Sequence, residues 1–335
     1  MLPGSVSDGG LRRHATRPRE EPAMAVTSAA VRPRPSILSR LAESRNVLGF
    51  GFMLPAAALL LVFLTYPLGL GVWLGFTDAR IGRPGIFVGI ENYEYLWSDS
   101  IFWLSVFNTL LYTVSASILK FALGLWLALI LNENIRFKSF FRAVVLLPWV
   151  VPTVLSAIAF WWIYDSQFSI LSWALQQMGL IDHRINFLGD PTNARASVIA
   201  ANVWRGIPFV AITLLAGLQT IPQSLYEAAT LDGASRSQLF RYVTLPLLTP
   251  IIAITMTFSV LFTFTDFQLI YVLTRGGPVN ATHLMATLSF QRGISGGQLG
   301  EGAAIAVAMI PFLLAAILFS YFGLQRRKWQ QGGGD

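Results

Sequence analysis

Six long apolar stretches constrain this chain more than any other feature of its sequence. Each holds about twenty or more residues that are mostly apolar, which is the length that an α-helix needs to cross a bilayer. Because the hydrocarbon core offers no water to the backbone, such a stretch must satisfy its own peptide groups as a helix. We therefore predict an all-α integral membrane protein with six core spans, at about 47–76, 104–132, 142–164, 197–219, 248–274 and 302–323.

Composition agrees with this class and excludes several others. The chain of 335 residues is 54% hydrophobic and 12% charged, and its mean hydropathy is +0.58. It contains no cysteine, which excludes disulfides and cysteine-based zinc sites, and its three histidines lack the spacing of a metal site. No Ser/His/Asp set or pair of carboxylates gathers in one region, so we predict that the chain is not an enzyme.

The positive charges indicate membrane topology. The formal net charge is +7, and Lys and Arg cluster beside the apolar spans, which argues against nucleic acid as the partner. Sixteen of them fall on one side of the predicted spans, namely eight arginines before residue 46 and Arg136, Lys138, Arg142, Arg236, Arg241, Arg326, Arg327 and Lys328. Six fall on the other side, namely Arg80, Arg83, Arg184, Arg195, Arg275 and Arg292. The excess predicts a multi-pass protein of the bacterial cytoplasmic (inner) membrane with both termini in the cytoplasm.

The chain divides into three parts. Residues 1–46 are rich in Arg, Pro, Ser and Gly, which predicts a disordered basic cytoplasmic tail. This tail either contacts anionic membrane lipid or is simply solvated, and the sequence leaves open whether the chain starts at Met1 or Met24. Residues 47–325 form the predicted transmembrane domain, with a polar loop at 220–247, and residues 326–335 form a short cytoplasmic tail.

Two local patterns refine this plan. The segment FVGIENYEYLW, between the first and second spans, predicts a short amphipathic helix at the membrane surface. Pro148, Pro152 and Pro208 lie within predicted spans, where a missing backbone N–H loosens or kinks a helix.

The polar loop at 220–247 is expected to fold as a helix, a turn and a second helix. Leu225, Ala228 and Ala229 follow helical spacing and share one face, on which two alanines allow another surface to come close. Gly233 permits the backbone to stop this helix and turn. Ser235 is a helix cap for the second helix, SRSQLFRYV, which we predict to end before Pro246.

The loop also carries a motif. Its residues run E-A-A, three residues, G, nine residues, V-x-L-P, and this pattern resembles the EAA loop of permease subunits of bacterial ABC importers. Six residues match the pattern, Glu227, Ala228, Ala229, Gly233, Leu245 and Pro246, while Val243 replaces the commoner Ile. LYEAATLDGAS is similar to the carbohydrate branch of that family. Gly276, Gly277 and Pro278 resemble a GGP motif of the first of two permeases, the maltose and glycerol-phosphate type.

This resemblance implies a type I ABC importer permease fold. In that family the loop is a cytoplasmic coupling helix that docks into a cleft on the ATPase, so Asp232 and Ala234 are expected to contact the ATPase together with the six matching residues. The implied partners are a second permease in a heterodimer, two ATPase subunits that bind ATP and Mg, and an extracytoplasmic sugar-binding protein. This chain would bind no cofactor itself. The alternatives are an ordinary amphipathic loop helix, a membrane-embedded enzyme or a secondary transporter acting on sugars.

Polar residues inside the spans are candidates for the transport pathway, because they are costly in lipid and tend to face a cavity. Asn108, Arg205, Asp266, Gln268 and Tyr271 are predicted to form one polar layer. A pair between Arg205 and Asp266 either holds helices together or contacts sugar. Lys120 either snorkels to the cytoplasmic surface or neutralises a carboxylate in the bundle.

Aromatic residues are the second group of pathway candidates. A sugar presents apolar faces that stack on aromatic rings, and Trp161, Trp162, Tyr164 and Trp204, with Trp149, are placed to supply them. The alternative is that these residues anchor span ends at the membrane interface.

Overall fold

The fold is described from a computed structural model, which covers residues 45–330 of the chain, with side chains from 46 to 318. The basic tail predicted over 1–46 lies outside the described residues except for its last two positions. The chain divides into two compact units, Met1–Leu61 and Val62–Asp335. Regular structure within the described residues is helical apart from two isolated β-bridges, Thr77 with Phe87 and Arg80 with Arg83, which confirms the all-α prediction.

The described part of the first unit is essentially one helix, α2 (Arg45–Leu60). From Val47 onward its residues are apolar or glycine and exposed, as expected for a surface that faces lipid or another subunit. The helical stretch continues along the chain through a π-helical turn (Leu61–Thr65) and α3 (Tyr66–Leu74). Together these residues form a 29-residue candidate span, Asn46–Leu74, which matches the first predicted span.

Four other long helices match predicted spans. They are α5 (Ser100–Asn132), α9 (Pro191–Leu218), the run Arg236–Leu273 that contains α12 (Leu245–Phe264), and α15 (Leu299–Gln330). Among the described residues, five helices are therefore long and apolar enough to cross a membrane, and a bent pair makes a sixth if it counts as one span.

The bent pair corrects the third predicted span. In place of one helix over 142–164, the chain forms α6 (Lys138–Val150) and α7 (Thr153–Ile163), which meet at an angle of 90°. The break falls at Val151 and Pro152. Proline has no N–H to continue the helix, and it forces the preceding residue into an extended conformation, here φ −64° and ψ 129° at Val151.

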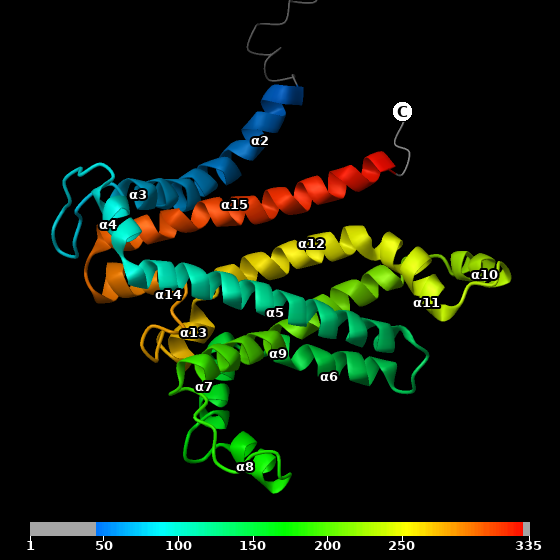
Figure 1. Cartoon of the computed structure of the whole chain (residues 1–335). Coiled ribbons are helices and arrows are strands. Elements are labelled where there is room, and N and C mark those ends of the chain that lie inside the picture. The colour runs from blue at the N-terminus through cyan, green and yellow to red at the C-terminus, as the bar shows by residue number, and fades with distance from the viewer. Residues whose placement is uncertain (1–44, 331–335) are drawn as a thin grey trace, which may run out of the picture. The chain divides into compact units, whose positions relative to one another are not determined.

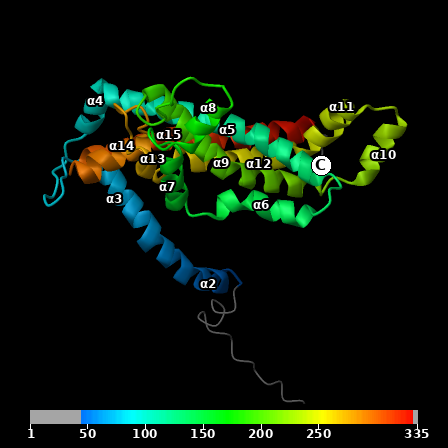
Figure 2. The same ribbon diagram turned by 90° about the horizontal axis from the view of Figure 1, so that it is seen from below.

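The core of the second unit lies where α5, α9 and α12 run side by side (Figures 1 and 2). Ala128 and Leu131 of α5 pack with Val210 and Leu214 of α9 and with Leu248 of α12, all of them buried. Small residues bring the helices together: a Cβ added to Gly124 would lie 2.7 Å from the Cγ1 atom of Val210. Close approach at small residues is the usual way that helices associate in a membrane, where burial of apolar surface drives little.

The short segments gather at two ends of the second unit. Helices α4 (Glu91–Ser98), α13 (Gln268–Leu273) and α14 (Met285–Phe290) lie at one end, and α4 is the short helix predicted from ENYEYLW (Figure 1). Helices α10 (Gln223–Leu231) and α11 (Arg236–Gln238) lie at the other end, as does the turn between α5 and α6 (Figure 1). The loops that carry Arg136, Arg236 and Arg241 therefore share one end, as the charge count requires.

The α10–α11 segment folds largely as its sequence predicts. Gly233 has a φ of +82°, a conformation that L side chains rarely adopt, and it directly follows Asp232, the C-cap of α10. Ser235 caps the next helix through a capping box with Gln238, whose side chain accepts from the Ser235 N–H at 2.7 Å.

The prediction that this second helix ends before Pro246 is wrong. The helix passes through a π-helical turn (Leu239–Thr244) and continues directly into α12, with Pro246 in its first turn. In the wider turn, the Leu245 N–H bonds to the Phe240 carbonyl, five residues back. Proline is tolerated inside a membrane helix where a local π-helical adjustment compensates for its missing N–H.

Candidate functional site

The fifth span is interrupted near the end of the bundle that holds α13. Helix α12 ends at Phe264 and α13 begins at Gln268, so that Thr265, Asp266 and Phe267 form a break between them. Non-helical backbone at membrane depth is tolerated only where protein buries it or where it lines a cavity. The break therefore marks this part of the bundle as a candidate site.

The carboxylate of Asp266 sits in this break with two donors on one oxygen. The Tyr112 hydroxyl of α5 donates to its Oδ2 at 2.7 Å, and the Asn202 amide of α9 donates to the same atom at 2.9 Å. Lys120 extends the network, because its ammonium donates to the Asn202 Oδ1 at 3.0 Å and to the Thr263 Oγ1 at 2.5 Å. The network thus joins α5, α9 and α12 around one half-buried carboxylate.

A cavity of about 500 Å³ opens beside this network. Its wall combines charged and amide side chains with aromatic rings, and consists of Lys120, Trp149, Thr153, Asn202, Arg205, Gly206, Phe262, Thr263, Thr265, Asp266, Phe267 and Gln268. Trp149 stacks on Phe209 at a centroid distance of 5.2 Å, which fixes the orientation of its ring. Hydrogen-bonding groups beside aromatic faces are the two features by which proteins hold small polar ligands with apolar faces.

The structure brings Arg205, Asp266 and Gln268 together on this wall, as the sequence predicts, but Arg205 and Asp266 do not pair. No salt bridge joins them in the part of the chain that is described, and the Arg205 Nε is buried without a hydrogen-bond partner. The predicted pair is therefore wrong. The Asp266 carboxylate instead accepts from Tyr112 and Asn202, both at its Oδ2.

Lys120 does not snorkel to a surface. Its side chain is only 4% exposed, and it reaches Asp266 indirectly, through the shared Asn202 amide. Of the two alternatives drawn from the sequence, the structure resembles neutralisation of a carboxylate. Lys120 and Asp266 are not in direct contact, because the Asn202 amide lies between them.

The other predicted pathway residues lie away from this cavity wall. Asn108 is buried, and its amide donates to the carbonyls of Asn280 and His283 at 3.2 Å each. Its Oδ1 accepts from Arg195. These bonds hold the segment before α14 against α5. Tyr271 stacks on Phe267, with their centroids 5.0 Å apart.

The predicted aromatic residues also lie elsewhere. Trp161 and Trp162 are exposed on α7 and touch each other edge to face. Trp204 packs edge-on against Phe160, and Tyr164 is buried, with its hydroxyl donating to the Ser197 carbonyl at 3.3 Å. Of the aromatic candidates from the sequence, the structure places only Trp149 on the cavity wall.

Sequence reasoning missed Tyr112, Asn202 and Thr263. Asn202 was detectable, because it is an amide in the apolar run VIAANVW of the fourth span. Tyr112 and Thr263 carry no such signal, since both residue types are common in membrane helices and only packing shows which of them face the break.

The α10–α11 segment is a second candidate site. Glu227, Ala228, Asp232 and Gly233 are exposed, and so are Leu225 and Leu231, which leaves apolar surface uncovered on a short polar helix. Ala229 and Ala234 are half-buried. The Tyr226 hydroxyl and the buried Thr244 Oγ1 lie 3.0 Å apart and hydrogen-bond, which ties α10 to the turn that leads into α12. Leu245 and Pro246, the last two motif residues, form the start of α12.

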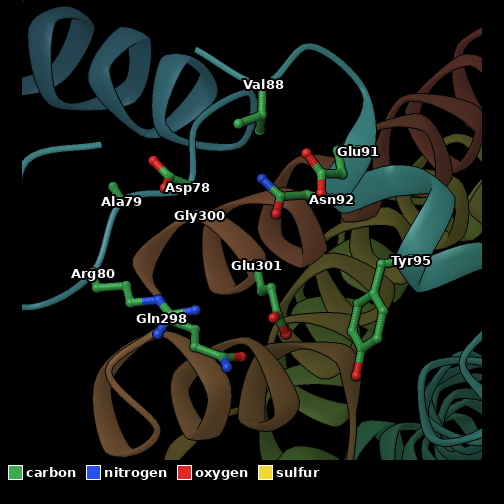
Figure 3. Close-up of a pocket in the computed structure, with 10 residues that line it drawn as sticks. All are labelled: Asp78, Ala79, Arg80, Val88, Glu91, Asn92, Tyr95, Gln298, Gly300 and Glu301. Atoms are coloured by element: carbon green, nitrogen blue, oxygen red, sulfur yellow. The ribbon is translucent and has the colours of Figure 1, made fainter. Parts of the chain in front are cut away.

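A smaller cavity, of about 230 Å³, lies at the end that holds α4 (Figure 3). Its wall comes from the segment after α3, from α4 and from the start of α15, and includes Asp78, Arg80, Glu91, Tyr95 and Glu301 (Figure 3). Glu301 pairs with Arg292 at 3.4 Å. Between residues 45 and 330, no group of His, Cys, Asp or Glu side chains has the arrangement of a metal site.

Comparison with known proteins places this architecture in a family. The family described as binding-protein-dependent transport system inner membrane component matches residues 120–330. The chain is 36% identical, over 87% of its length and 99% of the relative, to the trehalose/maltose transport system permease protein MalF of Thermococcus litoralis. It is 35% identical to the sulfoquinovosyl glycerol transport system permease protein SmoG of Agrobacterium fabrum, over 76% of this chain and 83% of that protein.

A solved structure agrees with these relatives. A chain from the crystal structure of a bacterial ABC transporter involved in the import of the acidic polysaccharide alginate superposes with a TM-score of 0.73 at 25% identity. The superposition covers 84% of this chain and 96% of that chain. The family match over 120–330, the relatives and the solved structure lead to one conclusion. This chain belongs to the binding-protein-dependent transport system inner membrane components and is a permease subunit of an ABC importer.

Proposed function

We propose that this permease imports a carbohydrate through the cavity beside Asp266. The observation that carries the proposal is the wall of that cavity, where a carboxylate, a guanidinium and amides stand next to the rings of Trp149, Phe262 and Phe267. Sugar hydroxyls both donate and accept hydrogen bonds, and sugar C–H faces stack on rings, so the wall offers both kinds of contact. The relatives named for trehalose, maltose and sulfoquinovosyl glycerol support the same substrate class.

The partners follow from the proposal. A second permease completes the pathway as a heterodimer, two ATPase subunits bind ATP and Mg, and an extracytoplasmic sugar-binding protein delivers the substrate. A related importer has been solved with a periplasmic protein bound to alginate pentasaccharide, which supports the last of these for this fold. ATP is hydrolysed on the partner subunits, and this chain binds no cofactor and acts as a pathway wall and coupling element.

The mechanism is a shift between two packings of one bundle, one with the cavity open outward and one with it open inward. The exposed Glu227 to Gly233 segment docks on the ATPase, and closure of the ATPase dimer moves it. Tyr226 and Thr244 pass that movement to α12, whose far end is the break at Asp266.

The substrate class is tested by reconstitution. We expect liposomes that hold this chain, its second permease and the ATPase, supplied with the binding protein, to take up at least one of maltose, trehalose and a uronic-acid oligosaccharide when ATP is inside. Radiolabelled methionine and inorganic phosphate serve as controls and should stay outside. ATP-driven uptake of either control, with no uptake of any sugar, would contradict the carbohydrate assignment.

The proposed orientation places α10 in the cytoplasm and α4 outside. The chain has no native cysteine, so single cysteines can report the side of each loop. We expect Ser237→Cys to react with a membrane-impermeant maleimide only after the cells are permeabilised. The matched control, Ile86→Cys, replaces a side chain that is 70% exposed before α4 and should react in intact cells. The reverse pattern would overturn the orientation and with it the docking of α10 on the ATPase.

A further inference from the structure

Lys120 takes an unusual course through the bundle. It lies on α5 where that helix meets α9, and its side chain runs directly over Gly206. A Cβ atom at position 206 would lie 2.3 Å from the Lys120 Cδ, so that only glycine leaves room for the lysine to pass. The ammonium group ends in the interior, where the residue is 4% exposed.

The hydrogen bonds of Lys120 fix the orientation of the Asn202 side-chain amide. An ammonium can only donate, so the Asn202 Oδ1 must face Lys120, at 3.0 Å. The Asn202 Nδ2 must then point the other way, where it donates to the Asp266 Oδ2 at 2.9 Å. A carboxylate can only accept, so the two charged groups together allow one orientation of the amide.

The same network leaves one oxygen of Asp266 less occupied. Tyr112 and Asn202 both donate to Oδ2, whereas Oδ1 accepts only a long bond of 3.4 Å from the Leu269 N–H. Asp266 also lines the cavity. Its Oδ1 is thus the oxygen with capacity for a further donor, such as a sugar hydroxyl.

We propose that Lys120 is a positioning residue for Asp266: acting through Asn202, it holds the carboxylate in the break between α12 and α13 and keeps Oδ1 available to the substrate. The role as a substrate group rests on the function proposed above. A charged group inside a membrane protein is expensive unless it is compensated. Without Lys120, Asp266 would lose the cation that acts on it through Asn202, and its charge would draw the break toward water.

The test uses the absence of cysteine from the chain. Leu269→Cys places a reporter on a fully buried side chain next to the break, and its rate of reaction with a small maleimide measures opening of the break. In the assembled importer, we expect Lys120→Met, which keeps the length of the side chain, to raise that rate at least tenfold. Adding Asp266→Asn to Lys120→Met should return the rate to within threefold of the parent, because no uncompensated carboxylate remains.

Two further variants separate positioning from mere filling of space. Thr263→Val removes the other acceptor of Lys120 but leaves the bond to Asn202, and should change the rate less than twofold. Asn202→Leu cuts the link and should act like Lys120→Met, which keeps the test informative if the lysine variant does not assemble. The proposal would be overturned if Lys120→Met and Asn202→Leu both left the rate unchanged. It would also be overturned if the double variant Lys120→Met with Asp266→Asn reacted no more slowly than Lys120→Met alone. The measurement needs no sugar, so it is independent of the uptake experiment, and either can fail alone.

Discussion

Gly233→Pro is expected to abolish ATP-driven uptake while the permease still inserts and assembles. Gly233 has a φ of +82°, and its N–H donates to the Thr230 carbonyl at 3.0 Å, which closes the end of α10. Proline fixes φ near about −65° and has no N–H, so it cannot adopt this turn. The turn sets the direction of α10 relative to α11, and under the proposed mechanism a misdirected α10 cannot dock on the ATPase. The expected readout is loss of uptake with normal amounts of this chain in purified membranes.

A matched control exists in the same chain. Gly179 follows α8 (Ile170–Gln177), has a φ of +69°, and its N–H donates to the Gln176 carbonyl, also at 3.0 Å. Gly179→Pro disturbs an equivalent turn in a different loop, so it carries a comparable local strain cost without touching α10. We expect it to retain most uptake. Equal loss in both variants would show that the effect is general destabilisation.

A charge reversal tests the same surface without backbone strain. Glu227 is exposed on α10 and forms no salt bridge within the described residues, so Glu227→Lys should leave the fold intact. We expect uptake to fall at least tenfold and the ATPase to lose its stimulation by the loaded binding protein. Normal uptake by this variant and by Gly233→Pro would refute the coupling role of α10.

Asp266→Asn is expected to produce the second large loss, at least tenfold in uptake. The substitution keeps the shape of the side chain but removes the negative charge that compensates the buried Lys120 through Asn202. The cost is below the ~3–5 kcal/mol for one side of a buried direct ion pair in soluble proteins, because Asp266 is half-buried and acts on Lys120 only through Asn202. An amide nitrogen is also a donor, so one of the present donors to Asp266 loses its acceptor.

Asp78→Asn is the control for this change. Asp78 pairs with Arg83 on an exposed loop, where a salt bridge contributes about 0–1 kcal/mol to the free energy of unfolding. We expect uptake by Asp78→Asn within twofold of the parent. The protein amount and the thermal midpoint in detergent should be compared for both variants, since Asp266→Asn is expected to lower the midpoint as well. Full uptake by Asp266→Asn would remove the carboxylate from the pathway.

Sequence patterns predict most of the helical plan because the bilayer imposes local rules. Apolar length alone locates α5, α9 and α15. Gly233 and the Ser235 cap are equally readable, since a left-handed turn and an N-cap depend on residues that are neighbours in the chain. The two errors in the plan, at Pro152 and Pro246, concern prolines. A proline only limits the backbone, and packing decides whether the helix breaks, as at Pro152, or widens into a π-turn and continues.

The cavity could be predicted only in part. Three residues of the cavity wall are polar residues in apolar runs, namely Asp266, Arg205 and Gln268. Polar side chains are costly in lipid, so such residues stand out in the sequence. Their partners do not, because Tyr112, Asn202 and Asp266 lie on three helices and meet only through the way in which those helices pack.

By itself, the sequence of this protein determined where most of the long apolar helices lie and that the α10 motif is present, because each of these depends on a continuous stretch of chain. Only the tertiary structure decided that Lys120 lies over Gly206, that Asn202 stands between Lys120 and Asp266, and that Arg205 is left unpaired beside the cavity. The physical reason is that hydrogen bonds act over about 3 Å. Contacts this short between distant residues are set by the register and crossing of packed helices, which no local pattern records.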